Sequence, residues 1–139
     1  MRAQMAVMDG TAHAPVRGPA ASEISRGLVR LNAKLYGRGP VRAKTYIHDD
    51  CVVCILQSVF TTAERTLISI GKADEVRRSR AAFAEATERD MCEIVEGAIG
   101  RRVHGCIGGV HTDLDTVAKV FLLDPQQASP NGDGAQFKT

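Results

Sequence analysis

The sequence has no tryptophan, and tyrosine and phenylalanine raise its aromatic content to only 4%. The hydrophobic core must therefore be built mainly from Val, Ile, Leu and Ala. No apolar run approaches the roughly 20 residues that a membrane-spanning helix needs, and residues 1–10 lack the unbroken apolar segment of a secretory signal. These absences favour a cytoplasmic protein, in which the four cysteines are reduced and no disulfide framework is expected.

The sequence also lacks a strong excess of either charge. A formal net charge of +2 is too small to point to a nucleic acid or a membrane surface as the partner. The chain has 139 residues, of which 44% are hydrophobic and 24% charged, as in an ordinary globular domain. Residues 1–21 and 125–139 show no hydrophobic periodicity and are expected to be flexible tails. They flank one predicted domain at residues 22–124.

The first half of that domain predicts a helix and a β-hairpin. Apolar residues three and four apart form one helical face, with Ser22 as N-cap and Gly37 just past the end: Ile24, Leu28, Leu31 and Leu35. Residues 41–48 then alternate between apolar and polar, as in a strand with one buried face. Asp49 and Asp50 fit a two-residue turn. Residues 51–60 are nearly all apolar, which predicts an interior strand covered on both faces.

The second half predicts two helices and another hairpin. Thr61 and Glu64 match a capping box at the start of a short helix, whose inward residues are expected to be Ala63, Leu67 and Ile70. A longer helix, capped by Asp74, should run to Ile99 with a core face that includes Phe83, while the arginines at 77, 78 and 80 are assigned to a solvent face. Strands follow at about residues 103–107 and 116–123.

These elements occur in the order α-β-β-α-α-β-β, which predicts an α+β fold. Its simplest arrangement is a two-layer sandwich, with a four-stranded antiparallel sheet made from two β-hairpins and helices on one face. The apolar strand at residues 51–60 indicates that the other sheet face is covered as well. A second copy of the chain would cover it, so we expect a homodimer.

A Cys-x-x-Cys motif at Cys51 and Cys54 is the first candidate for chemistry. With His104 and Cys106 it is compatible with a zinc site or a redox pair. However, residues three apart on a strand point to opposite faces, and no helix N-terminus follows Cys54 to stabilise a thiolate. We therefore interpret the cysteines as small core residues, and expect neither a metal site nor a cofactor.

Two polar groups remain as candidate binding sites. Basic residues on or beside the first strand, with a tyrosine among them, are suited to an anion, an RNA or an acidic partner: Arg38, Arg42, Lys44 and Tyr46. A solvated strand face or a dimer contact explains them equally well. His111 and Asp113 lie in a polar segment between the last two strands, where they can bind a ligand or simply form a turn. No nucleophile with an identifiable base accompanies them, so we do not expect an enzyme.

The order of several short motifs resembles one bacterial family. A Gly-Arg-Gly-Pro turn at residues 37–40 leads into a basic strand and an Asp-Asp hairpin. An apolar strand, a Thr-x-Ala-Glu cap and a long charged helix follow, and then Gly-Val-His-Thr-Asp at 109–113 and Val-Phe-x-Leu at 120–123. Together they resemble MpsC, a component of a Na⁺-translocating, membrane-potential-generating system. The resemblance implies a non-enzymatic accessory or regulatory role in sodium or bicarbonate transport, with a membrane transport or regulatory protein as partner. It implies no catalytic residues.

Overall fold

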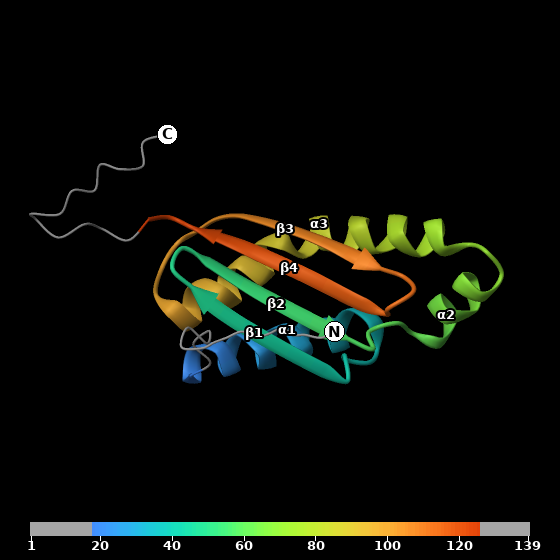
Figure 1. Ribbon diagram of the computed structural model, residues 1–139, viewed down its shortest axis with the longest axis horizontal. Helices are drawn as coiled ribbons and strands as arrows, with labels where there is room; N and C mark the ends of the chain where they lie inside the picture. Colours follow the sequence, from blue (N-terminus) through green and yellow to red (C-terminus); the bar gives the residue numbers. More distant parts are fainter. Residues whose placement is uncertain (1–17, 126–139) are drawn as a thin grey trace, which may run out of the picture.

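The computed structural model describes residues 18–125, which form three helices and four strands in the predicted order (Figure 1). The elements are α1 (Pro19–Tyr36), β1 (Arg42–His48), β2 (Cys51–Gln57), α2 (Thr62–Ser69), α3 (Ala73–Ile99), β3 (Val103–His111) and β4 (Thr116–Leu123). Residues 1–17 and 126–139, which make up most of the two predicted tails, lie outside the described residues. No helix in the described part of the chain is long and apolar enough to cross a membrane.

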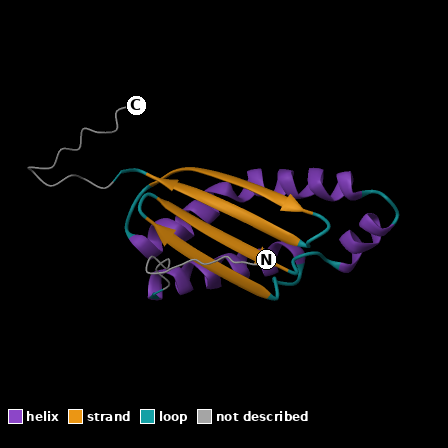
Figure 2. Cartoon of the chain, viewed as in Figure 1, coloured by secondary structure: helices purple, strands orange, loops and turns teal. Residues whose placement is uncertain are grey.

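The four strands form one antiparallel sheet in the order β1-β2-β4-β3. The two hairpins therefore meet through β2 and β4, which become the central strands, and β1 and β3 lie at the edges. Helices α1 and α3 lie together behind this sheet as a second layer (Figure 2). The predicted α+β two-layer architecture is confirmed.

The hydrophobic core lies between the helices and one face of the sheet. Because side chains alternate along a strand, Val52, Cys54 and Leu56 of β2 point to the helices and are at most 1% exposed. They pack with other buried residues from both layers: Ile24, Leu28, Val95 and Phe121. The prediction that β2 is interior is correct, although within the described chain only this face of it has helices packed on it.

Helix α1 begins earlier than its sequence pattern indicates. Its N-cap is Gly18 rather than Ser22, and Pro19 occupies the first turn. Proline suits that position because its fixed φ is already helical and its missing N–H would have no partner there. The helix therefore starts within the segment predicted as a tail. Its end is as predicted, since Gly37 has a left-handed φ of 80° and donates its N–H to the Ala33 carbonyl.

Helix α2 has the predicted capping box but a different buried face. Thr61 accepts a hydrogen bond from the Glu64 amide at 3.1 Å, and the Glu64 carboxylate accepts one from the Thr61 amide at 2.9 Å. The expected inward residues Ala63 and Ile70 are exposed, and Ile70 is 63% exposed. The predicted set of inward residues is wrong because the Glu64 side chain is buried. The helix therefore packs Glu64 and Leu67 against the rest of the protein.

Helix α3 also departs from its predicted pattern. Its N-cap is Lys72 and has no side-chain cap, and Asp74 instead pairs with Arg77 within the first turn. Two predicted orientations are reversed: Arg80, which was assigned to solvent, is 6% exposed, and Phe83, which was assigned to the core, is 41% exposed. Gly100 ends the helix as predicted, in a left-handed conformation.

Candidate functional site

Three of the four predicted basic-strand residues share one face of the sheet. Arg42, Lys44 and Tyr46 alternate with inward residues along β1 and pair with Gln57, Ile55 and Val53 of β2, respectively. They therefore lie on the face that is turned away from the helices, which we call the open sheet face. Arg38 does not join them, because its guanidinium donates a 2.6 Å hydrogen bond to the Phe60 carbonyl.

The predicted pair His111 and Asp113 lies at the opposite edge of the sheet. His111 is the last residue of β3, and its Nδ1 accepts a 3.2 Å hydrogen bond from the Leu114 amide, so it helps to form the turn. The pairing of strands places Arg42, Gln57, Thr116 and His111 in one row across the sheet. Since Arg42 and His111 stand three strand spacings apart, or roughly 14 Å, the two predicted groups do not form one site.

The residue with the strongest contacts in this turn is Asp115, which the sequence analysis did not single out. Its Oδ1 accepts hydrogen bonds from the amides of Val59 at 2.7 Å and Phe60 at 2.9 Å. It also adopts a left-handed φ of 52°, which Asp tolerates better than most residues. Asp115 thus joins the β3–β4 turn to the segment after β2. A turn aspartate is an ordinary sequence feature, and nothing in the sequence indicates that its acceptor serves a segment more than 50 residues away.

The open sheet face combines an apolar centre with a basic edge. Val53 and Ile55 of β2 and Val120 of β4 are partly buried, and the neighbouring residues are more exposed, with Leu122 at 37% and Ile107 at 61%. The basic residues of β1 border this apolar strip along one edge of the sheet. Within the described part of the chain, no helix lies over this face (Figure 2).

On the helix-covered face, α2 and α3 are joined by a buried ion pair. Arg80 donates hydrogen bonds to both carboxylate oxygens of Glu64 at 2.8 Å and to the Val59 carbonyl at 3.1 Å. Its guanidinium also lies 3.8 Å from the centroid of the Tyr36 ring, a cation–π distance. Burial raises the pKa of the Tyr36 hydroxyl above its usual 10.0, more than Arg80 lowers it.

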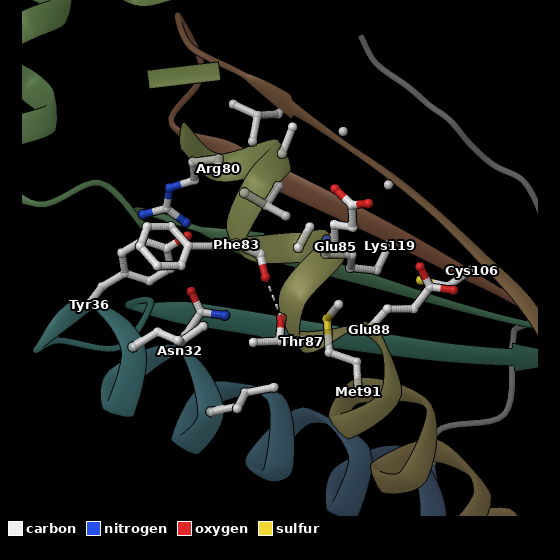
Figure 3. Close-up of a pocket in the computed structure, with 18 of the residues that line it drawn as sticks. Asn32, Tyr36, Arg80, Phe83, Glu85, Thr87, Glu88, Met91, Cys106 and Lys119 are labelled. Carbon is white, nitrogen blue, oxygen red and sulfur yellow. Dashed lines mark hydrogen bonds between the residues drawn. The ribbon is translucent and has the colours of Figure 1, made fainter. Parts of the chain in front are cut away.

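A cavity of about 360 Å³ opens beside this ion pair, between α1, α3 and the inner face of β3 and β4 (Figure 3). Its walls expose more apolar than polar surface, and the lining residues with polar side chains are Asn32, Tyr36, Arg77, Arg80, Glu85, Thr87, Glu88, Cys106 and Lys119. Lys119 is the unexpected member, because it lies on the inward face of the central strand β4 between Val117 and Phe121. The sequence signal for this placement is the position of Lys119 in β4, two residues from Val117 and from Phe121, which puts it on the same inward face.

The four cysteines are all free thiols, spread over β2, α3 and β3. Cys54 is fully buried and accepts a 3.3 Å hydrogen bond from Thr45, whereas Cys51 points to the open sheet face. Burial raises the pKa of the Cys54 thiol, and it raises the pKa of Cys106 to about 11. A catalytic or redox thiol needs the opposite shift. Among the residues that the structure describes, no cluster of three His, Cys, Asp or Glu side chains is placed to hold a metal ion.

Comparison with known proteins places this chain in a family. The model of the family described as Na⁺-translocating membrane potential-generating system (MpsC) matches residues 17–125, which is most of the chain and includes every helix and strand that the structure describes. No curated protein and no solved structure matches it. On the strength of the family match, the chain belongs to the MpsC family.

Proposed function

We propose that this chain is a non-enzymatic accessory protein of a Na⁺-translocating, membrane-potential-generating system, and that it works as a homodimer through its open sheet face. The system is suggested by the MpsC family, to which the chain belongs. The observation that carries the dimer is the apolar strip of Ile107, Val120 and Leu122, which has no helix over it in the described chain. Such a strip is typical of a surface that binds another protein.

The charge pattern along β1 favours a second copy as the occupant. The strand begins with Arg42 and Lys44, and its last residue, His48, is followed in the turn by Asp49, whose side chain is 86% exposed. If two sheets pack face to face about a two-fold axis perpendicular to the strands, β1 runs antiparallel to its counterpart. The basic start of each β1 then lies over the acidic end of the other, so the charges are complementary while the apolar strips meet at the centre.

The oligomeric state tests the dimer directly. We expect the wild-type protein to sediment as a dimer at micromolar concentration and the Ile107→Lys variant as a folded monomer, because a lysine would bury its charge in the apolar interface. Leu114→Lys is the matched control: Leu114 is also exposed, at 66%, but lies in the β3–β4 turn. It should remain a dimer. A wild-type protein that is monomeric at micromolar concentration would overturn the dimer and leave the open sheet face for a different protein.

Deleting the gene in the cells that naturally carry it tests the proposed role in the Na⁺-translocating system. Deleting it should reduce sodium-dependent growth and membrane potential, and wild-type protein should restore both. A non-enzymatic role predicts that His111→Ala, Asp113→Ala and Cys51→Ser restore function fully, whereas Ile107→Lys does not. A deletion that leaves both phenotypes unchanged overturns the assigned process, and a failure of the polar variants to restore them overturns the non-enzymatic role.

A second candidate function is binding of an anion or RNA by the same edge of the open face. The observation that favours it is that Arg42 and Lys44 are both exposed on that face with Tyr46 beside them. Binding of a fluorescent single-stranded RNA should then weaken steeply with salt and weaken further in Arg42→Ala and Lys44→Ala. RNA binding that ignores salt, or that survives both substitutions, excludes this function.

A further inference from the structure

The cavity between the helices and the sheet is open to solvent on one side, where exposed Ala81, Phe83 and Glu88 line it. Protein interiors are normally close-packed, with few voids larger than a water molecule. Here about 360 Å³ is left open beside the core, and small residues line it, namely Ala81 and Ala84 on α3 and Gly108 and Gly109 on β3. That volume falls at the lower end of the range for small-molecule sites. The cavity therefore has the size of a site for a small ligand.

Lys119 gives this cavity a polar end. In the register of the sheet Lys119 stands opposite Gly108, and its stem crosses that glycine so closely that an added Cβ would lie 2.8 Å from the lysine Cδ and 3.1 Å from Nζ. Because Gly108 has no Cβ, the Lys119 side chain can cross it and lie in the cavity (Figure 3). Among the described residues, the ammonium group has neither a hydrogen bond nor an ion pair.

The other charges of the cavity are already balanced or lie at its mouth. Arg80 is neutralised by Glu64, with which it shares two hydrogen bonds, and Arg77 pairs with Asp74. Glu85 and Glu88 line the cavity from exposed positions on α3. Burial lowers the pKa of the Lys119 ammonium below its usual 10.5, more than nearby Cys106 and Glu88 raise it. The interior consequently holds one partly dehydrated cation that an anion would stabilise.

The rest of the lining sets the nature of the ligand. Leu31 and Leu35 of α1, Phe83 and Met91 of α3 and Val117 of β4 supply apolar walls. Phe83 stands at the opening, where its ring meets the Tyr36 ring edge-on with centroids 5.4 Å apart (Figure 3). Its 41% exposure, unexpected for a helix position that the sequence assigns to the core, is explained if a ligand completes its packing.

We propose that this cavity binds a small amphiphilic carboxylate, whose carboxylate group pairs with Lys119 while its apolar chain lies between α1 and α3. The site is on the helix-covered face of the sheet, opposite the proposed dimer surface, so it does not depend on that interface. It adds a ligand to the accessory role, and the ligand would fix the position of α3 relative to β3.

Calorimetric titration of the full chain with octanoate tests the proposal. We expect saturable binding with one octanoate per chain, and binding at least tenfold weaker for 1-octanol and octylammonium, which lack the negative charge that pairs with Lys119. The amide of Gly108 in the cavity should shift in NMR spectra on titration, while the amides of Arg42 and Lys44 on β1 should not. No binding at millimolar octanoate, or equal affinity for the alcohol, overturns the proposal.

Substitutions test separately the contributions of the Lys119 charge and of the cavity volume to octanoate binding. Lys119→Met should weaken octanoate binding about tenfold or more while keeping a similar volume, and Glu88→Gln should strengthen it by removing a carboxylate that competes for the lysine. Lys34→Met is the matched control, because Lys34 is exposed on α1 and does not line the cavity, and it should bind as the wild type does. Ala84→Leu, which fills the cavity from α3, should abolish binding without touching the charge, and it remains a test if Lys119→Met does not fold. Wild-type affinity in both Lys119→Met and Ala84→Leu refutes the site.

Discussion

Arg80 of α3 and Glu64 of α2 form a buried, bidentate ion pair with two hydrogen bonds of 2.8 Å. Glu64 also closes the capping box of α2 through Thr61, so one carboxylate both starts the short helix and attaches it to the long one. Because Arg80 also donates to the Val59 carbonyl, the pair connects both helices to the segment that leaves the sheet. It is a buried polar link between α2 and the rest of the domain, in addition to the more exposed ion pair of Arg65 with Asp115 at 3.5 Å.

Removing one member of this pair should destabilise the protein strongly. Glu64→Ala leaves Arg80 buried without its partner, and such a loss lowers the free energy of unfolding by about 3–5 kcal/mol. Urea denaturation followed by circular dichroism measures it. Glu93→Ala is the control, because Glu93 forms an exposed ion pair with Arg89 at 3.9 Å, and it should change stability by less than about 1 kcal/mol. Similar results for both variants would contradict a structural role for the buried pair.

The same pair predicts how stability depends on acid. Burial tends to raise the pKa of Glu64, but hydrogen bonds from Arg80 and Thr61 outweigh it and hold that pKa below its usual 4.5. A carboxyl group whose pKa is lowered by folding stabilises the protein above its unfolded-state pKa, and the contribution is lost as the pH falls through the folded-state value. The stability difference between wild type and Glu64→Gln should therefore be constant near neutrality and shrink below about pH 4.5. Denaturation at several pH values measures it, and a difference that grows in acid contradicts the assignment.

Three substitutions of Asp115 separate its acceptor from its backbone conformation. Both amide hydrogen bonds go to a single oxygen, Oδ1, so Asp115→Asn can keep them and should cost about 1 kcal/mol or less. Asp115→Gly and Asp115→Ala leave the backbone amides of the buried residues Val59 and Phe60 without this acceptor. Each unsatisfied amide should lower the free energy of unfolding by about 1–3 kcal/mol. The glycine variant suffers no strain at φ 52°, so it should be the less damaging of the two. Thermal denaturation gives the order, and an asparagine variant as unstable as the alanine one would contradict it.

Two helical glycines should respond to alanine in opposite ways. A Cβ at Gly27 would lie 2.7 Å from Cγ2 of Ile94, where α1 meets α3, whereas a Cβ at Gly97 would meet nothing within 4 Å. Gly27→Ala should destabilise the protein by about 1–3 kcal/mol through overpacking. Gly97→Ala should stabilise it by up to about 1 kcal/mol, because alanine favours the helix. Denaturant titrations of both variants measure the contrast, and a stabilised Gly27→Ala would show that the helices have room to separate.

Local sequence patterns determined most of the architecture. The alternation in residues 41–48, the Asp49-Asp50 turn and the Thr61–Glu64 capping box all predict what the structure has, because each depends on residues that are adjacent or one turn apart. The left-handed glycines after α1 and α3 were predictable for the same reason. The two-layer arrangement follows from the order of elements and from the need to bury one face of each.

The tertiary structure alone decided which polar residues are buried and which are brought together. An arginine in a basic run gives no local sign that it will meet Glu64, 16 residues earlier, and a turn aspartate gives none that it will hold Val59 and Phe60. The strand order β1-β2-β4-β3 places Arg42 and His111 at opposite edges of the sheet. It also puts Lys119 on a central strand, paired with Gly108 of the neighbouring edge strand β3. Sequence periodicity reports the face on which a side chain lies, but the partner on that face is set by how distant segments pack.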